Sequence, residues 1–277
     1  MNKKLIAILL AGFSAGVLQV NAQTGNTPAP AAAAVAAPTP PPAPSWSQSL
    51  SPTYVSQYMF RGVRLGQDSI QGAYDATYGN WDLGIWASNP IGRNKVSPGS
   101  SQPELDPYGS YTWALTDSLS LQPGFTWYTY IHAPTNQGFY RETFEPNLAL
   151  NWTVGGFKIQ PKVYDDVILH GPTYELNGYY TVPLKDWGTE LDFTGTVGTY
   201  FQYDAVNGST PHTHAYGNYW LAGVAAPYQL TKDLKLTVGW AYTAGSDAYF
   251  KQKGFKRVKN TAAQGKGVVS VGLTWSW

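Results

Sequence analysis

The sequence predicts an all-β protein: a transmembrane, antiparallel, up-and-down β-barrel of about 12 strands. Three observations support this fold class. Short runs alternate between apolar and polar residues from residue 50 onward, the connections between them tend to be short and long in turn, and the chain ends on an apolar strand. Together they are typical of a barrel with a lipid-facing exterior and a polar interior.

The chain ends with SVGLTWSW at residues 270–277. In a strand, alternate residues share a face, so Leu273, Trp275 and Trp277 lie on one side and Ser270 and Gly272 on the other. A flat apolar strand in water invites edge-to-edge association. We therefore expect the apolar face to meet lipid and the strand to pair with another one, closing the barrel.

Composition supports strands and turns over helices. The chain has 277 residues, of which 15% are aromatic and only 13% charged, with 29 glycines and no cysteine. Without cysteine, disulfides and thiolate metal sites are excluded. The net charge is +1, and we expect no nucleic-acid partner.

Residues 1–22 read as a secretory signal peptide. Lys3 and Lys4 precede an apolar segment, and the small-residue site ending at Ala22 predicts a mature chain that begins at Gln23. An uncleaved anchor helix is the alternative. Beyond this segment no apolar run is long enough for a membrane helix.

Residues 23–47 form a linker rich in proline and alanine, and residues 48–277 form the predicted barrel. The linker is either a passive flexible periplasmic spacer or a segment that tethers the barrel or enters it. Its prolines favour extended backbone over a packed core.

Twelve alternating runs are the predicted strands. They are residues 51–64, 69–78, 81–89, 105–115, 119–132, 140–152, 157–169, 173–184, 189–203, 214–230, 234–244 and 266–277. Links after even runs are short, whereas most links after odd runs are longer, with 65–68 and 170–172 as exceptions. An even strand number with short turns at one end is typical of outer-membrane barrels.

Two features leave alternatives open. A soluble barrel or sandwich also alternates, with its apolar face inside, and only the signal peptide, the aromatic C-terminus and the connection lengths favour the membrane. Pro107, Pro123, Pro146 and Pro161 fall inside predicted strands, where proline removes a ladder hydrogen bond. We expect bulges or strand ends at these positions.

The segments YVSQYMFRGVRLGQDSIQGAYD at 54–75, GIWASNP at 84–90 and ELDPYGSY at 104–111 resemble the TorF-type porin family. The resemblance is strongest in the first four strands and implies an outer-membrane β-barrel. It carries no catalytic residues to this chain.

The C-terminal strand separately resembles the end signal of many outer-membrane proteins. Ser270, Gly272, Trp275 and Trp277 occupy its four positions. This resemblance implies recognition by the barrel-assembly machinery, and the alternative is a terminal strand with a structural role only.

Charged residues on the polar faces are the candidate site. The predicted pore-lining residues are Arg61, Asp75, Arg141, Glu145, Lys162, Asp166, Glu175 and Asp192. Asp82, Asp106, Glu190, Lys158 and Lys235 have the same predicted orientation. Opposed charges in a lumen select solutes by charge and size, or they pair and hold the wall. We expect Arg61 to pair with a lumen carboxylate such as Asp75.

A basic segment follows the eleventh run. It contains Lys251, Lys253, Lys256, Arg257, Lys259 and Lys266. On the outer side it would face lipopolysaccharide or attract anionic solutes, although a solvated loop is an equal alternative. His212 and His214 lack the further ligands that a metal needs, so neither a metal nor another cofactor is expected.

The pattern as a whole predicts a porin-like channel for small hydrophilic solutes. We expect it in a bacterial outer membrane with both termini periplasmic and without enzymatic activity. Five tyrosines of the polar faces would narrow its interior: Tyr128, Tyr130, Tyr164, Tyr179 and Tyr200. A filled barrel with a structural or surface-binding role is the first alternative, and a membrane-embedded hydrolase is the second.

Overall fold

The computed structural model describes residues 45–91, 103–246, 249–252, 258–259 and 265–277. The predicted signal peptide and nearly all of the linker lie outside these ranges. Within the described residues, no helix has the length and apolar character needed to span a bilayer.

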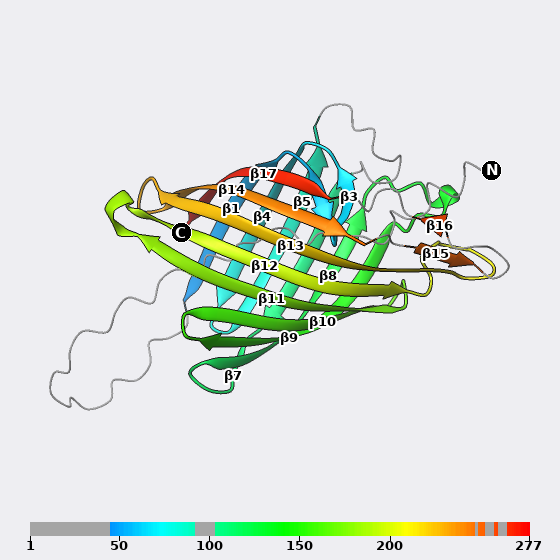
Figure 1. The fold of residues 1–277 in the computed structure, drawn as a ribbon, viewed down its shortest axis with the longest axis horizontal. Helices are drawn as coiled ribbons and strands as arrows, with labels where there is room; N and C mark the ends of the chain where they lie inside the picture. Colours follow the sequence, from blue (N-terminus) through cyan, green and yellow to red (C-terminus); the bar gives the residue numbers. More distant parts are fainter. Residues whose placement is uncertain (1–44, 92–102, 247–248, 253–257, 260–264) are drawn as a thin grey trace.

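Twelve antiparallel strands form a closed barrel (Figure 1). They are β1 (Trp46–Val55), β4 (Ser69–Tyr78), β5 (Trp81–Pro90), β6 (Glu104–Tyr111), β8 (Leu119–Tyr130), β9 (Glu142–Val154), β10 (Phe157–Asp166), β11 (Gly171–Leu184), β12 (Thr189–Gln202), β13 (Thr213–Gln229), β14 (Leu234–Gly245) and β17 (Lys266–Ser276). The short β7 (Trp113–Ala114) continues β6 along β8. Pairing of β1 with β17 closes the wall, which confirms the predicted fold class.

The apolar faces of the strands point outward. On β17, Val269, Val271, Leu273 and Trp275 are 41–55% exposed, while Val268, on the opposite face, is 6% exposed. The same alternation follows the other strands, with Leu83, Leu176 and Val238 among the exposed side chains. A soluble barrel would have the reverse orientation, so that alternative is wrong for the described residues.

The two ends of the barrel differ. One end, here the turn end, carries the short connections 79–80, 155–156, 185–188 and 230–233. Both ends of the wall also lie there, because the backbones of Gln48 and Trp277 exchange two hydrogen bonds of 3.0 Å. The other end, here the loop end, carries most of the longer connections, and the C-terminus lies opposite it in Figure 1.

The first predicted strand, 51–64, is wrong in its second half. β1 ends at Val55, and the chain then forms a small hairpin of β2 (Tyr58–Phe60) and β3 (Val63–Gly66). Arg61 and Gly62 turn it with φ of 46° and 73°, the left-handed pair that a two-residue hairpin turn requires. The first connection therefore spans 56–68, and its predicted shortness is also wrong.

The expected bulges at the four prolines are absent. Pro123 pairs with Leu148, between the regular pairs Gln122–Ala149 and Gly124–Asn147. At the other three prolines the register is the same before and after the proline. In an antiparallel pair each residue bonds to only one neighbouring strand, so a proline removes one bond without shifting the register.

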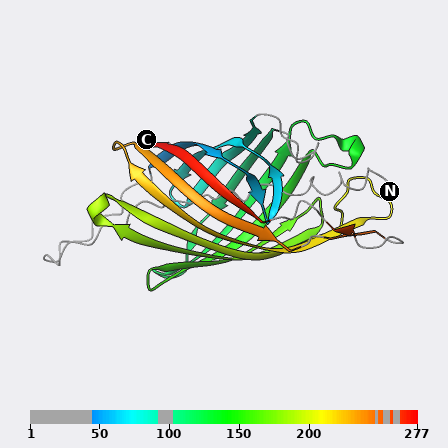
Figure 2. The same ribbon diagram turned by 45° about the horizontal axis from the view of Figure 1, so that its top comes forward.

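Aromatic side chains gather near both ends of the outer face. Trp46 packs on Tyr78 and Phe157 on Tyr180 near the turn end, with ring centroids 5.0 and 4.4 Å apart. Near the loop end Phe144 packs on Trp127. Phe144 and Trp152 lie eight residues apart on β9, about 27 Å along a tilted strand, which suits the apolar band of a membrane barrel. Figure 2 shows the strands inclined around a common axis.

Candidate functional site in the barrel interior

The hairpin of β2 and β3, here the inner hairpin, reaches into the barrel from the loop end. At its tip the Arg61 Nη1 and Nη2 atoms donate to Glu145 Oε1 and Oε2 on β9, at 2.9 and 3.0 Å. The Arg61 guanidinium also stacks on Tyr164 of β10, 4.8 Å from the ring centroid. A two-pronged pair of this kind fixes the direction of both side chains.

Further contacts attach the inner hairpin to two other parts of the wall. The Tyr58 hydroxyl donates to Glu104 of β6 at 2.7 Å. Gly62 touches β14 so closely that a Cβ there would lie 2.4 Å from the Gly245 nitrogen. Phe60, Val63 and Leu65 are 1–3% exposed, so burial of the hairpin's apolar face adds to these contacts.

Arg61 pairs with a carboxylate of the barrel interior, as predicted, but the partner is Glu145 and not Asp75. Asp75 faces the interior from β4, where it accepts a hydrogen bond from the Tyr108 hydroxyl. Arg61 instead reaches Glu145 because it lies on the infolded tip and not on the barrel wall. Strand alternation alone could not show this.

Loop-end residues pack around the inner hairpin. Phe139 and Leu169 are fully buried, and Tyr200 is 1% exposed. The Tyr140 hydroxyl donates to the Asp204 carbonyl oxygen at 2.9 Å, and burial raises the pKa of Tyr140 to about 12. Among the described residues, the loop-end half of the interior is filled by side chains.

Asp204 also holds two histidines at the loop end. Its carboxylate lies 3.6 Å from His170 Nε2 and contacts His212 Nδ1. His214 packs its ring edge-on against Tyr203 instead. No group of three or more possible ligand side chains within the described residues could hold a metal ion.

A polar cavity occupies the rest of the interior, toward the turn end. It comprises two adjoining spaces of about 890 and 930 Å³ that share lining residues such as Trp86, Gln122 and Lys158. Met59 of the inner hairpin lines both, so the hairpin forms the boundary between the cavity and the packed half.

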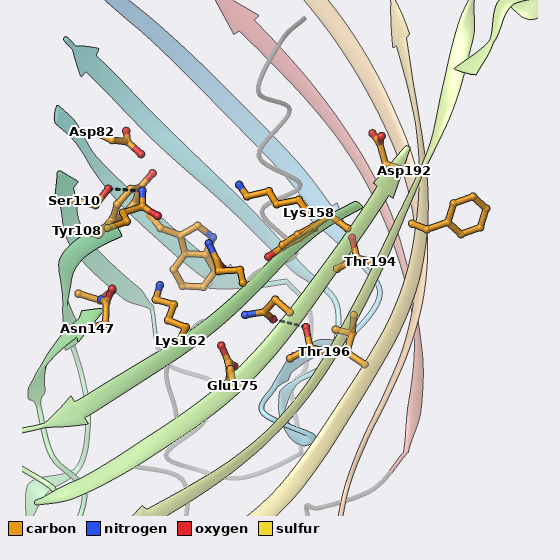
Figure 3. A pocket seen from close by; sticks show the side chains of 18 of the residues that line it. Asp82, Tyr108, Ser110, Asn147, Lys158, Lys162, Glu175, Asp192, Thr194 and Thr196 are labelled. Atoms are coloured by element: carbon orange, nitrogen blue, oxygen red, sulfur yellow. Dashed lines mark hydrogen bonds between the residues drawn. The ribbon is translucent and has the colours of Figure 1, made fainter. Parts of the chain in front are cut away.

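The cavity wall carries separated charges. Lys158 and Lys162 reach in from β10, whereas Asp82 reaches in from β5 on another side (Figure 3). Neutral donors and acceptors also lie along the wall. The Gln160 amide donates to Asn151 at 2.7 Å, and the Thr196 hydroxyl donates to Asn177 at the same distance.

The predicted site residues divide into three groups. Arg61, Lys162, Glu175 and Asp192 line one cavity space and Asp75 the other. Glu145 lies behind Arg61 with 1% exposure.

Two predicted pore-lining residues lie elsewhere. Arg141 is an exposed loop residue before β9, so its placement on the inner wall is wrong. Asp166 is buried at the loop end of β10, where its Oδ1 accepts backbone N–H bonds from Ile168 and Leu169. Its predicted inward orientation holds, but its carboxylate stabilises a turn and does not line the cavity.

The structure also places parts of the predicted end signal and of the predicted basic segment. On β17 the side chains of Ser270 and Trp275 lie on opposite faces, as expected for the end signal. Lys251 and Lys259 belong to β15 (Tyr249–Gln252) and β16 (Val258–Lys259), which extend the sheet beyond β13. Lys253, Lys256 and Arg257 lie outside the described residues.

Sequence reasoning missed the contacts that attach the inner hairpin. Gly245 and the hydroxyl of Tyr58 were not singled out. The stretch YMFRG carried a signal, since a glycine after Phe-Arg permits a left-handed turn, and a turn there would have interrupted the long first strand.

The closed wall, apolar exterior and polar cavity define a porin-like β-barrel. The chain belongs to the Gcw_chp family, described as a bacterial protein of unknown function, whose model matches residues 42–274. The likeness to TorF-type porins stays a prediction. The chain matches no curated protein.

Solved structures match this chain at low identity and with TM-scores below 0.5. The KdgM porin is 14% identical over 83% of this chain and 99% of its own, with a TM-score of 0.48. An outer-membrane channel from Pseudomonas putida F1 is 11% identical over 85% and 96%, with a TM-score of 0.39. The outer-membrane protease OmpT from Escherichia coli is 12% identical over 84% and 96%, with a TM-score of 0.30. Channels and a protease both occur among these structures, so they do not decide the function.

Proposed function

We propose that the protein is an outer-membrane channel for the passive diffusion of small hydrophilic solutes. The polar cavity carries this proposal. Because the wall around it is apolar outside, the cavity would place water and ionisable groups at membrane depth. A barrel that only filled space would have no need of an interior volume of this size.

The inner hairpin would be the constriction of this channel. In the described state it separates the cavity from the loop end, so conduction requires it to shift or leave. Its attachment rests on a few polar contacts and on the burial of a short apolar face. Such a segment can move while the hydrogen-bonded wall stays intact.

The proposed location in the outer membrane is based on the predicted signal peptide and on the end of the barrel where β1 and β17 meet. The predicted signal peptide would send it across the inner membrane, and the turn end, where β1 and β17 meet, would face the periplasm. The linker would then hang on the periplasmic side. The loop end, with the basic segment that includes Lys251 and Lys259, would face lipopolysaccharide.

The C-terminal strand supports a proposal about assembly. Gly272 lies between Thr53 and Thr237 of the neighbouring strands, and a Cβ there would lie 2.5 Å from the Thr53 hydroxyl. The glycine therefore has a packing role in the finished seam. We propose that the same strand is bound by the barrel-assembly machinery before the seam forms.

A second candidate function has one observation in its favour. The packed loop-end half, with Phe139, Leu169 and Tyr200 buried, is what a filled barrel with a structural or surface-binding role would show. The absence of enzymatic activity stays a prediction in either case.

Planar-bilayer recording separates the two candidates. The mature chain is compared with a variant in which residues 57–67 are replaced by a short glycine-containing turn. A channel gives stable conductance steps that become larger and more frequent in the variant. If both proteins are silent although they fold in detergent, the channel proposal fails and the filled barrel is favoured.

A further inference from the structure

The β10 wall of the cavity presents a cation with no ionic partner. Lys158 is directly opposite Thr153 on one side and Tyr179 on the other. Its Nζ lies 5.7 Å from the centroid of the Tyr179 ring. No described carboxylate oxygen lies within the 4.0 Å of this ammonium that an ion pair would require.

The contrast with Arg61 makes this absence informative. Arg61 also lies in the interior, and two of its nitrogens are held by Glu145. Buried or confined cations in proteins are ordinarily paired in this way. Lys158 lacks such a partner although it lines both spaces of a cavity that contains several carboxylates.

Two of those carboxylates already accept hydrogen bonds from hydroxyl groups, and a third faces the cavity from a distant strand. Glu175 accepts hydroxyl bonds from Tyr164 and Tyr219, at 2.5 and 2.6 Å. Asp192 accepts one from Thr181 at 2.7 Å. Asp82 faces the cavity from β5, on the side toward which Lys158 extends in Figure 3.

Neutral hydrogen-bonding groups continue the wall beside Lys158. Gln160 and Lys162 are the next two inward residues of β10, and successive inward residues lie about 6.7 Å apart along a strand. Asn177 lies on the adjacent strand β11 and Thr194 on β12 beyond it, and both line the same space. The surface offers an ammonium, then amides and hydroxyls, then a second ammonium.

We propose that this wall binds a small hydroxylated carboxylate, with the carboxylate on Lys158. The hydroxyl groups of the ligand would form hydrogen bonds with the side-chain amides of Gln160 and Asn177. Asp82, across the cavity, would accept a hydrogen bond from one of these hydroxyl groups. The inference rests on the proposed channel in one respect: it names the class of solute that the channel would favour.

Charge arrangement favours an anion over a neutral solute of the same shape. A carboxylate of the ligand can be neutralised at Lys158, which has no ionic partner among the described residues. An uncharged polyol would make the hydroxyl contacts and leave the ammonium without a partner. The wall therefore discriminates by charge on one side of the ligand and by hydroxyl donors on the other.

Gluconate and sorbitol are matched probes, because they differ in little more than the terminal carboxylate. Titration calorimetry of the detergent-solubilised mature chain measures their binding directly. Gluconate is expected to bind, and sorbitol is expected to bind at least about tenfold more weakly, as the loss of one charge-assisted hydrogen bond predicts.

Lys158→Gln is the test variant and Lys232→Gln its control. Lys232 lies in the turn 230–233 beside Asp233, with 89% of its side chain exposed, so the control removes the same charge outside the cavity. Lys158→Gln is expected to weaken gluconate binding about tenfold, whereas Lys232→Gln is expected to leave it unchanged.

Equal binding of gluconate and sorbitol, or equal affinity in both variants, overturns the inference. Reversal-potential measurements in a gluconate gradient are made on the same preparations. Conduction without gluconate binding would leave the channel proposal standing and remove the site. Binding without conduction would leave the site standing and remove the channel.

Discussion

Arg61 at the tip of the inner hairpin and Glu145 on β9 are joined by two hydrogen bonds, although 84 positions separate them in the chain. Their side chains are 6% and 2% exposed. The pair connects the one infolded segment of the described structure to the far wall. It therefore helps to hold in place the segment that divides the interior, and the first prediction concerns it.

Replacement of Arg61 by alanine should release the inner hairpin. A buried carboxylate left without its partner costs about 3–5 kcal/mol, and hairpin displacement would relieve that cost by admitting water to Glu145. We expect Arg61→Ala to conduct more than the parent, and Arg61→Ala combined with Glu145→Ala to be more stable than Arg61→Ala alone. Single-channel recording and urea unfolding measure the two effects. A single variant as closed and as stable as the parent contradicts the assigned role.

Gly62 provides an independent test of hairpin docking. Gly62→Ala would place a methyl group 2.4 Å from the Gly245 nitrogen at a φ of 73°. Gly188→Ala is the control, because Gly188 has a φ of 63° but open space around its Cβ. The control bears only the backbone strain of about 1 kcal/mol, so the difference between the variants reports the contact with β14.

Thiol labelling measures that difference cleanly, because the chain has no cysteine. Leu65→Cys introduces one thiol at a position that is 2% exposed in the docked hairpin. We expect slow labelling in the Leu65→Cys chain and in its combination with Gly188→Ala, and fast labelling in combination with Gly62→Ala. Similar rates in all three proteins would show that Gly62 does not dock against β14.

Neighbouring residues of β14 test the orientation of the wall. Val238 points outward and is 47% exposed, whereas Thr237 lines the cavity. An arginine on the lipid face near the middle of a bilayer costs about 2–4 kcal/mol, so Val238→Arg should destabilise the folded barrel by that amount. Thr237→Arg should cost markedly less. Urea unfolding from lipid vesicles measures both, and an equal cost would argue against a lipid-facing exterior.

Tyr140 should make the loop end sensitive to alkali. Its pKa is raised from 10.0 to about 12, chiefly by burial, so the folded protein retains a proton that the unfolded chain loses. The resulting stability is present below about pH 10 and is lost as the pH rises toward 12. Tyr140→Phe should remove this part of the alkaline loss. Thermal unfolding of both proteins across that pH range checks it, and parallel curves would contradict it.

Alternation predicted the barrel because it reflects a local constraint. Val269, Val271 and Leu273 must share a face in any strand, and lipid requires that face to be apolar on every strand. The strand number could therefore be predicted from alternation, whereas the outward face was predicted from the signal peptide, the aromatic C-terminus and the connection lengths. The inner hairpin could not be predicted, because Val63 and Leu65 are apolar for burial inside the barrel, and the pattern does not distinguish burial by protein from burial by lipid.

Candidate site residues were predicted with less success for a related reason. Alternation placed Lys162, Glu175 and Asp192 on the inner wall, where the structure has them. It gave no information on which charges meet, since Arg61 and Glu145 belong to elements distant in the chain. Arg141 was misplaced because β9 begins one residue later, at Glu142.

The seam between β1 and β17 joins residues at opposite ends of the wall, with the Val269 amide donating to Ser56 across 213 positions. No shorter-range contact can substitute for it, because each of these strands has its other neighbour already fixed nearby in sequence. During biosynthesis an unfinished chain therefore exposes two unpaired edges until the final strand emerges. A chain with such topology folds slowly, and its unpaired strand edges are prone to aggregation before folding is complete. This protein should therefore depend on chaperones that cover these edges before it reaches the bilayer.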